Sequence, residues 1–157
     1  MSDQQRRGAS PERRYTFPRS HRLKRQRLIR SLFDRNRSDV HTKAAGCIRL
    51  LYRVVPREAT DYDVPLQIGF APGRRTETAV QRNRIRRVLR EVYRVHQHIL
   101  VDLFVRRPDA ALIVMALFRG DPEQAATCIP RDLPRVMRRV ADALASTDAS
   151  AASAAAP

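Results

Sequence analysis

This sequence lacks tryptophan, contains only two cysteines and five glycines, and has about half as many acidic as basic residues. No apolar run approaches the ~20 residues that a membrane-spanning helix needs, so we expect no membrane span and no membrane partner. The N-terminus has no apolar segment of the kind that directs secretion. Because Cys47 and Cys128 lie far apart and match no metal-ligand spacing, we expect reduced thiols and a cytoplasmic protein.

The sequence also lacks a recognisable catalytic cluster. A protein nuclease needs grouped carboxylates that hold metal ions, or a histidine-based acid–base pair. The 16 acidic residues are scattered, and Asp61 and Asp63 stand in a charged loop without a partner motif. His96 and His98 are two positions apart, so on a helix they point to different sides and cannot share a metal ion well. We therefore expect no catalytic residues and no metal site in this chain.

Positive charge is what the sequence has in excess, since 31 Lys and Arg residues against 16 acidic ones give a net charge of +15. Basicity of this degree says more about partners than about fold, and nucleic acid is the usual partner. Phe17, Phe33 and Tyr52 accompany basic segments, which favours RNA over DNA because unstacked bases stack on aromatic rings. The same rings also fit an ordinary packed core, and for Phe33 and Tyr52 both interpretations stay open.

The stretch around which the chain is organised is Ala79–Leu100, which we predict to be one helix. Its apolar residues recur with the three- and four-residue spacing of a single helix face. These residues are Ile85, Val88, Leu89, Val92, Val95 and Ile99. Thr76 or Thr78 can supply the side-chain oxygen that caps the N-terminus of this helix.

The opposite face of this helix is basic, because the stretch carries six arginines and one acid, Glu91. Like charges four residues apart, such as Arg86 and Arg90, destabilise a helix by about 0.2–0.5 kcal/mol per pair. A polyanion along this face reverses that effect, and the planar guanidinium group binds phosphate with two hydrogen bonds. The simpler alternative is a solvated basic face that has no partner.

The periodicities predict a single α/β domain, at residues 15–145, built as an α+β two-layer sandwich of helices on a mixed sheet. The expected order is helix, two or three strands, helix, strand, helix, because a short strand near Val40 stays open. Besides the central helix, the expected elements are a helix near Lys24–Asn36, strands at Cys47–Val55, Val64–Phe70 and Ala111–Phe118, and a helix from Arg131 or Asp132 to about Leu144. Residues 1–14 (basic) and 146–157 (Ala/Ser-rich) are expected to be disordered tails.

The helix core at roughly residues 79–91 resembles the signature of the protein subunit of bacterial ribonuclease P. In that signature Arg-Asn-Arg is followed by two basic residues and then by Arg-Glu, as in this sequence at residues 82–84, 86–87 and 90–91. Supporting pieces in the family's order and spacing are Phe17-Pro18, Arg22-Leu23, Leu32-Phe33, Leu51-Tyr52, Gly69-Phe70, Arg74-Arg75 and Ile113–Phe118.

The resemblance implies that the protein binds a catalytic RNA and assists it in cutting the 5′ leader from precursor tRNA, with magnesium ions at the RNA. It also implies one protein per catalytic RNA, a cleft between the first helix and the sheet that holds the leader, and a left-handed β-α-β crossover. Such a crossover departs from the strong right-handed rule. A function of another class, which composition alone allows, is a structural ribosomal or nucleoid-type nucleic-acid-binding protein.

Carried over residue by residue, the resemblance implies RNA contacts by the signature and by the loop before it. These residues are Arg82, Asn83, Arg84, Arg86, Arg87, Arg90, Arg74 and Arg75. It also implies that Phe33 and Tyr52 line the leader cleft, with Phe17 as a looser candidate. Two departures stand out, because Ile29 occupies the place of a second aromatic residue in the first helix, and Glu77 replaces a glycine with a negative charge.

Overall fold

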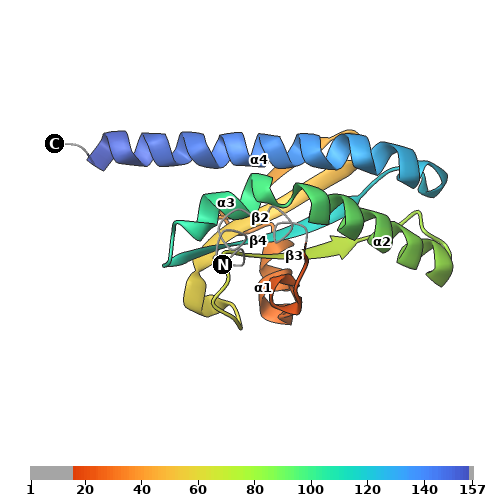
Figure 1. Cartoon of the computed structure of the whole chain (residues 1–157), viewed down its shortest axis with the longest axis horizontal. Helices are drawn as coiled ribbons and strands as arrows, with labels where there is room; N and C mark the ends of the chain where they lie inside the picture. Colours follow the sequence, from red (N-terminus) through yellow and green to blue (C-terminus); the bar gives the residue numbers. More distant parts are fainter. Residues whose placement is uncertain (1–15, 156–157) are drawn as a thin grey trace, which may run out of the picture.

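The computed structural model describes residues 16–155, so the basic tail expected at residues 1–14 lies outside the described residues. The chain forms a four-stranded mixed sheet with helices on both faces (Figure 1). Short 3-10 turns precede α1, follow β2 and precede α4. The helices and strands are α1 (Gln26–Leu32), β1 (His41–Ala45), β2 (Ile48–Pro56), β3 (Leu66–Ala71), α2 (Ala79–His96), α3 (His98–Val105), β4 (Ala110–Phe118) and α4 (Ala125–Ala155).

The strand order is β1-β2-β4-β3, which places β4 inside the sheet. β1 pairs antiparallel with β2, and β2 pairs antiparallel with β4, whereas β3 and β4 run parallel. Residues 111–116 of β4 are all buried, as the continuous apolar run predicts for a strand covered on both faces. The parallel pair needs a crossover connection, which α2 and α3 provide. The left hand of this crossover stays a prediction from the family resemblance.

The two faces of the sheet carry separate apolar cores. On the face covered by α2, α3 and α4, Leu50 and Tyr52 of β2 belong to the same packed cluster as Val140 of α4. On the other face, Leu28 of α1 packs in a second cluster with Ile113 of β4. Figure 1 shows α1 alone on its side of the sheet, with the other three helices on the opposite side. The predicted α+β class with a mixed sheet is confirmed, and α1 adds a partial third layer.

The stretch predicted as one helix over residues 79–100 is two helices, interrupted at Gln97. Gln97 keeps helical backbone dihedrals, with φ −58° and ψ −26°. Its buried side-chain amide donates hydrogen bonds to the carbonyl oxygens of Thr16, at 2.7 Å, and Arg94, at 3.0 Å. This amide ties the segment that precedes α1 to the junction between α2 and α3, an interaction between distant segments that local periodicity cannot reveal.

α1 is shorter than the helix expected near Lys24–Asn36. The Asp34 carboxylate accepts a hydrogen bond of 2.9 Å from the backbone N–H of Asn36, and this local turn competes with continued helix. The short strand that the sequence allows near Val40 is present as β1, directly after that residue.

α4 is longer at both ends than the sequence predicts. Residues 125–130, expected in a loop, are helical, although Pro130 and Pro134 lie inside the helix. Proline weakens a helix interior, but Ile129 and Leu133, which directly precede the two prolines, are fully buried, and this packing outweighs the lost hydrogen bonds. The helix also runs through 146–155, where we expected disorder, because alanine has the highest helix propensity. Within the described residues, no helix is both long and apolar enough to cross a lipid bilayer.

Asp132, one of the two residues expected to begin the last helix, lies inside α4 and ties it to the sheet. Its buried carboxylate accepts a hydrogen bond of 3.0 Å from the backbone N–H of Cys47 and one of 2.9 Å from Arg131. These donors hold the pKa of Asp132 well below its ordinary value. Gly46, in the turn between β1 and β2, has φ +53°, and a Cβ there would overlap the Asp132 carboxylate.

Candidate nucleic-acid interface

α2 is fixed at its start by a cap and along its length by the core. The Thr78 hydroxyl accepts a hydrogen bond of 3.1 Å from the backbone N–H of Gln81, so Thr78 and not Thr76 is the N-cap. Ile85, Leu89 and Tyr93 are buried, and they hold the helix against the sheet. The predicted apolar face omits Tyr93, which is buried, and includes Val95, which is exposed.

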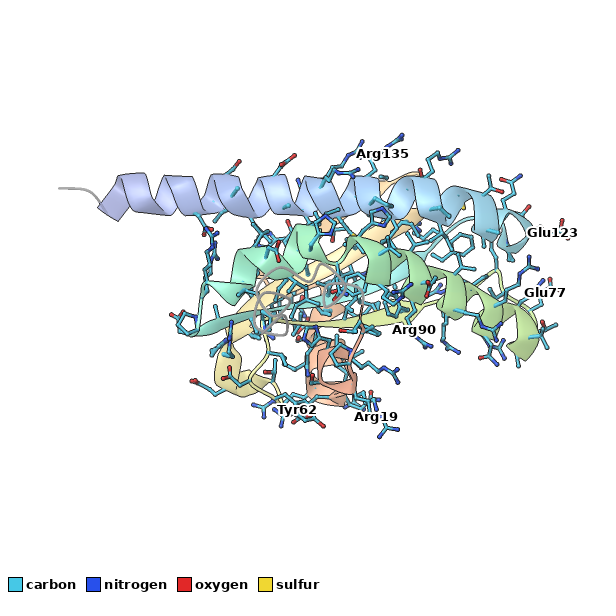
Figure 2. The ribbon with its side chains drawn as sticks, in the orientation of Figure 1. Arg19, Tyr62, Glu77, Arg90, Glu123 and Arg135 are labelled. Atoms are coloured by element: carbon cyan, nitrogen blue, oxygen red, sulfur yellow. The ribbon has the colours of Figure 1, made fainter. Side chains whose placement is uncertain are left out.

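The basic side of α2 faces solvent. Asn83, Arg84, Arg87 and Arg90 are exposed, whereas the other two signature arginines are half-buried at the edge of the helix. Figure 2 shows Arg90 on the side of α2 that is turned away from α4. Five signature arginines form no ion pair with a carboxylate among residues 16–148, whose side chains the structure describes: Arg82, Arg84, Arg86, Arg87 and Arg90. We call these five residues and Asn83 the α2 arginine face.

Arg94, the sixth arginine of the predicted helix, behaves differently. It forms an ion pair of 2.5 Å with Glu91, one turn earlier on α2. This pair lowers the pKa of Glu91 and raises that of Arg94. The single acid of the helix is therefore neutralised by the arginine outside the signature, and the α2 arginine face keeps its charge.

The loop before α2 adds two exposed arginines, Arg74 and Arg75. It is held by Gly73, whose φ of +87° and close approach to the Phe118 carbonyl leave no room for a Cβ. The Thr76 hydroxyl donates to the carbonyl oxygen of Gly73 at 2.8 Å. The positive end of the α2 dipole lies next to these arginines. Because the first turn of α2 contains no acidic residue, no side chain of that turn compensates this positive end. The helix end and the two arginines favour an anion here, whereas the exposed carboxylate of Glu77 in the same loop opposes one.

The three aromatic residues expected in one leader cleft are not brought together. Phe17 packs edge-on against Phe70 and Tyr93, with ring centroids 5.9 and 5.5 Å apart. Tyr52 is only 3% exposed and lies on the face covered by α4, whereas Phe33 is 50% exposed at the end of α1 on the other face. The prediction that Tyr52 lines a cleft beside α1 is wrong, because strand alternation points its ring to the opposite face.

A groove of about 250 Å³ does lie between the end of α1 and the sheet. Its lining includes Phe33, Leu51 of β2 and Leu117 of β4, with Arg35 and Arg49 as its basic side chains. The Nε of Arg49 is buried and has no hydrogen-bond partner among the described residues. Arg49 was not singled out from the sequence, although the alternation of β2 places it with Leu51 and opposite to Tyr52.

A charge network lies near this groove. Asp39 accepts hydrogen bonds from Arg37 at 2.9 Å and from Arg53 of β2 at 2.7 Å. These two guanidinium groups hold the pKa of Asp39 well below its ordinary value. Arg53 also donates to the hydroxyl of Ser31 on α1, at 3.0 Å. The network joins β2, α1 and the segment before β1. Arg53 therefore has partners within the fold, whereas the Nε of Arg49 has none among the described residues.

Groups that could hold a metal or act as nucleophiles are sparse in the described part of the chain. Residues 16–148 contain no group of three or more His, Cys, Asp or Glu side chains placed to bind a metal ion. His96 bonds through Nδ1 to the Val92 carbonyl oxygen, at 2.9 Å. Cys47 and Cys128 are free thiols, and burial raises the pKa of Cys47, which makes it a poor nucleophile.

Comparisons with known proteins agree with the fold. A family model described as Ribonuclease P matches residues 17–124 of this chain. The chain is 35% identical over 85 residues to the ribonuclease P protein component of Desulfovibrio desulfuricans, a match that covers 54% of this chain and 59% of that relative. The chain thus spans about three fifths of the length of this curated relative. Its fold is similar to that of the RNase P protein of Staphylococcus aureus, with a TM-score of 0.53 and 19% identity over 76% of this chain and 94% of that one.

Proposed function

We propose the function of this chain from its family, because the chain belongs to the ribonuclease P family. In this proposal it is the protein component of an enzyme that removes the 5′ leader from precursor tRNA. In this proposal the catalyst is an RNA, which also holds the magnesium ions. One copy of this chain binds each catalytic RNA, in the cytoplasm. The chain contributes binding and positioning, and none of its own residues takes part in the chemical step.

The observation that carries the proposal is the α2 arginine face, which is left without ion pairs to any described carboxylate. Charge of one sign, held at fixed spacing on a capped and packed helix, suits a phosphate backbone. A +15 protein bound to folded RNA lowers the repulsion between RNA phosphates. High magnesium concentrations do the same, so protein and metal ion are expected to replace one another in part.

We place the leader in the groove beside α1, not over Tyr52. Phe33 offers an exposed ring on which an unpaired base can stack. Arg49 supports a phosphate contact there, because its buried Nε lacks a partner among the described residues. The groove and the α2 arginine face belong to different sides of the sheet, so RNA and leader do not compete for the same residues.

Reconstitution tests the proposal. Purified protein is added to the ribonuclease P RNA and a precursor tRNA at a magnesium concentration too low for the RNA to act alone. We expect cleavage at the mature 5′ end to be restored. A structural ribosomal or nucleoid-type protein would bind RNA without restoring cleavage, and cleavage in the absence of the RNA would show a self-sufficient nuclease. Either result would overturn the proposal.

A further inference from the structure

A second group of arginines lies on α4, outside every part of the site described above. Arg131, Arg135 and the adjacent pair Arg138 and Arg139 recur at three- and four-residue spacing, and all four are exposed. We call them the α4 arginine row. Two of its pairs are four residues apart, Arg131 with Arg135 and Arg135 with Arg139, so each is unfavourable for an isolated helix. At 1.5 Å per residue the row spans about 12 Å, enough to contact several successive phosphates.

The centre of this row has no partner in the described part of the fold. Arg131 pairs with Asp132, and Arg139 donates to the carbonyl oxygen of Ala44 on β1. Arg135 and Arg138 make no ion pair with a carboxylate among residues 16–148. Asp142 lies one turn beyond Arg138 and is exposed, yet no ion pair joins the two side chains. The row therefore keeps most of its charge, as the α2 arginine face does.

The surface continues from α4 onto the edge strand β1. Lys43 is exposed on β1 and lines a hollow of about 350 Å³ between this strand and α4. His41 and Tyr52 also line the hollow, with ring centroids 5.6 Å apart. Asp39 lies at its rim, but Arg37 and Arg53 neutralise that carboxylate. Of the two rings only that of His41 is exposed, and it lies on the same surface as the cations of the row, a combination suited to a base next to its phosphate.

The α4 arginine row and the α2 arginine face lie on opposite sides of the molecule. Figure 2 shows Arg135 on the side of α4 turned away from the sheet, and Arg90 on the side of α2 turned away from α4. α2 and α4 pack against each other through their buried residues, which fixes this arrangement. One straight RNA helix cannot cover both surfaces.

The chemistry of the row favours RNA over a membrane or an acidic protein. Among the described residues, α4 carries no exposed large apolar side chain, and Val54 is the one such side chain that lines the hollow. A membrane-surface helix needs such side chains to enter the lipid, and a stable protein interface needs them at its centre. All four cations of the row are arginines, which bind phosphate through two parallel hydrogen bonds.

We propose that the α4 arginine row, with Lys43 and the hollow beside it, is a second RNA-binding surface. The protein then bridges two RNA segments, one on α2 and one on α4. The inference rests on the proposed function in taking RNA as the partner, but it concerns residues that the α2 signature does not include.

The test measures binding of a short RNA duplex as a function of salt concentration. The variant R135Q/R138Q removes two positive charges from the row, and R106E, at the exposed end of α3, changes the net charge by the same two units. If both arginines contact phosphates, the slope of log affinity against log salt falls by about 1.4–1.8 in R135Q/R138Q. A slope equal to that of R106E would overturn the inference. So would unchanged RNA binding together with loss of binding to anionic lipid vesicles, which would make the partner a membrane.

A second measurement separates the two surfaces. With two differently labelled duplexes in excess, the wild-type protein is expected to bring both labels together, detected as energy transfer. R135Q/R138Q and R87Q/R90Q should each bind one duplex and lose the transfer. Transfer that survives in R135Q/R138Q would overturn the inference while leaving the proposed function intact. Conversely, a protein that shows α4-dependent bridging but does not restore tRNA cleavage would refute only the proposed function.

Discussion

Phe33 and Tyr52 lie on opposite faces of the sheet, and this decides which ring an RNA base can reach. Phe33 ends α1 and leaves half of its surface to solvent. Tyr52 is covered by α4, and burial raises the pKa of its hydroxyl, so it behaves as part of the core. At the scale of single residues, side-chain direction separates the two aromatics more sharply than residue type does.

Replacing Phe33 by alanine should weaken binding of precursor tRNA by about tenfold and leave binding of mature tRNA unchanged, because one stacked base is lost. Since the side chain is half exposed, the fold should survive the change. Affinities of the reconstituted complex for the two tRNAs provide the measurement. Y52F, which removes only a hydroxyl on the α4 side, serves as the control and should leave both affinities unchanged. Equal weakening for both tRNAs in F33A would argue against a leader contact.

At the scale of elements, α4 is attached to the sheet through Asp132 and the turn between β1 and β2. The carboxylate receives hydrogen bonds from Arg131 and Cys47 N–H, and Gly46 provides the space for it. Because the folded pKa of Asp132 is depressed, its contribution to stability is present at pH values above the unfolded pKa of about 3.9. This contribution is lost as the pH falls below that value.

D132N should therefore lower the free energy of unfolding by about 1.5–3 kcal/mol at pH 7, the usual range for hydrogen bonds to a buried charged group. The difference from the wild-type protein should shrink as the pH falls below about 4, because the carboxyl group of the unfolded wild-type chain is then protonated while that of the folded protein resists protonation. Denaturant unfolding at several pH values gives both numbers. D142N, at an exposed position of the same helix, should change stability little at any pH. A difference in unfolding free energy between D132N and wild type that stays constant with pH would show that the ionised carboxylate of Asp132 does not stabilise the fold.

Among the elements, those with strong internal patterns were predictable and those set by distant contacts were not. The alternation in β2 and the apolar run in β4 gave the strands to within a residue or two. The break at Gln97 and the early start of α4 depend on Thr16 and on burial of Ile129, which no local window contains. The basic face of α2 is predictable from the spacing of its arginines. The unpartnered Arg49 and the exposed α4 arginine row are recognisable only once the packing of the sheet and helices is known.

At the scale of the whole molecule, positive charge is distributed over opposite sides of the fold (Figure 2). The protein carries a net charge of +15, and six of the fourteen acids among residues 16–148, such as Asp39 and Asp132, form ion pairs within the fold. The remaining cations act together on a large polyanion. The loss of a single contact is therefore easiest to measure at low salt and low magnesium concentrations, where dissolved ions screen the charges least.

The double variant R87A/R90A should reduce cleavage by the reconstituted enzyme by about tenfold at low magnesium concentration, corresponding to roughly 1.4 kcal/mol of lost phosphate contacts. At high magnesium concentration the loss should be much smaller, because metal ions then screen the RNA. Initial cleavage rates across a magnesium series provide the measurement, with R106E as a control that changes the net charge by the same two units away from α2. Equal loss at every magnesium concentration, accompanied by altered unfolding, would indicate a folding defect instead.

The position of β4 at the centre of the sheet has a consequence for how the protein is made. β2 and β3 both pair with β4, which follows them in the chain by more than the whole length of α2 and α3. Until residue 118 has left the ribosome, only the β1–β2 hairpin has its partner, and β3 has no strand to join. Assembly of the sheet therefore waits for a late, long-range closure, the kind of topology that folds slowly. Until then, the apolar residues of β2 and β3 are exposed to chaperones and to other nascent chains.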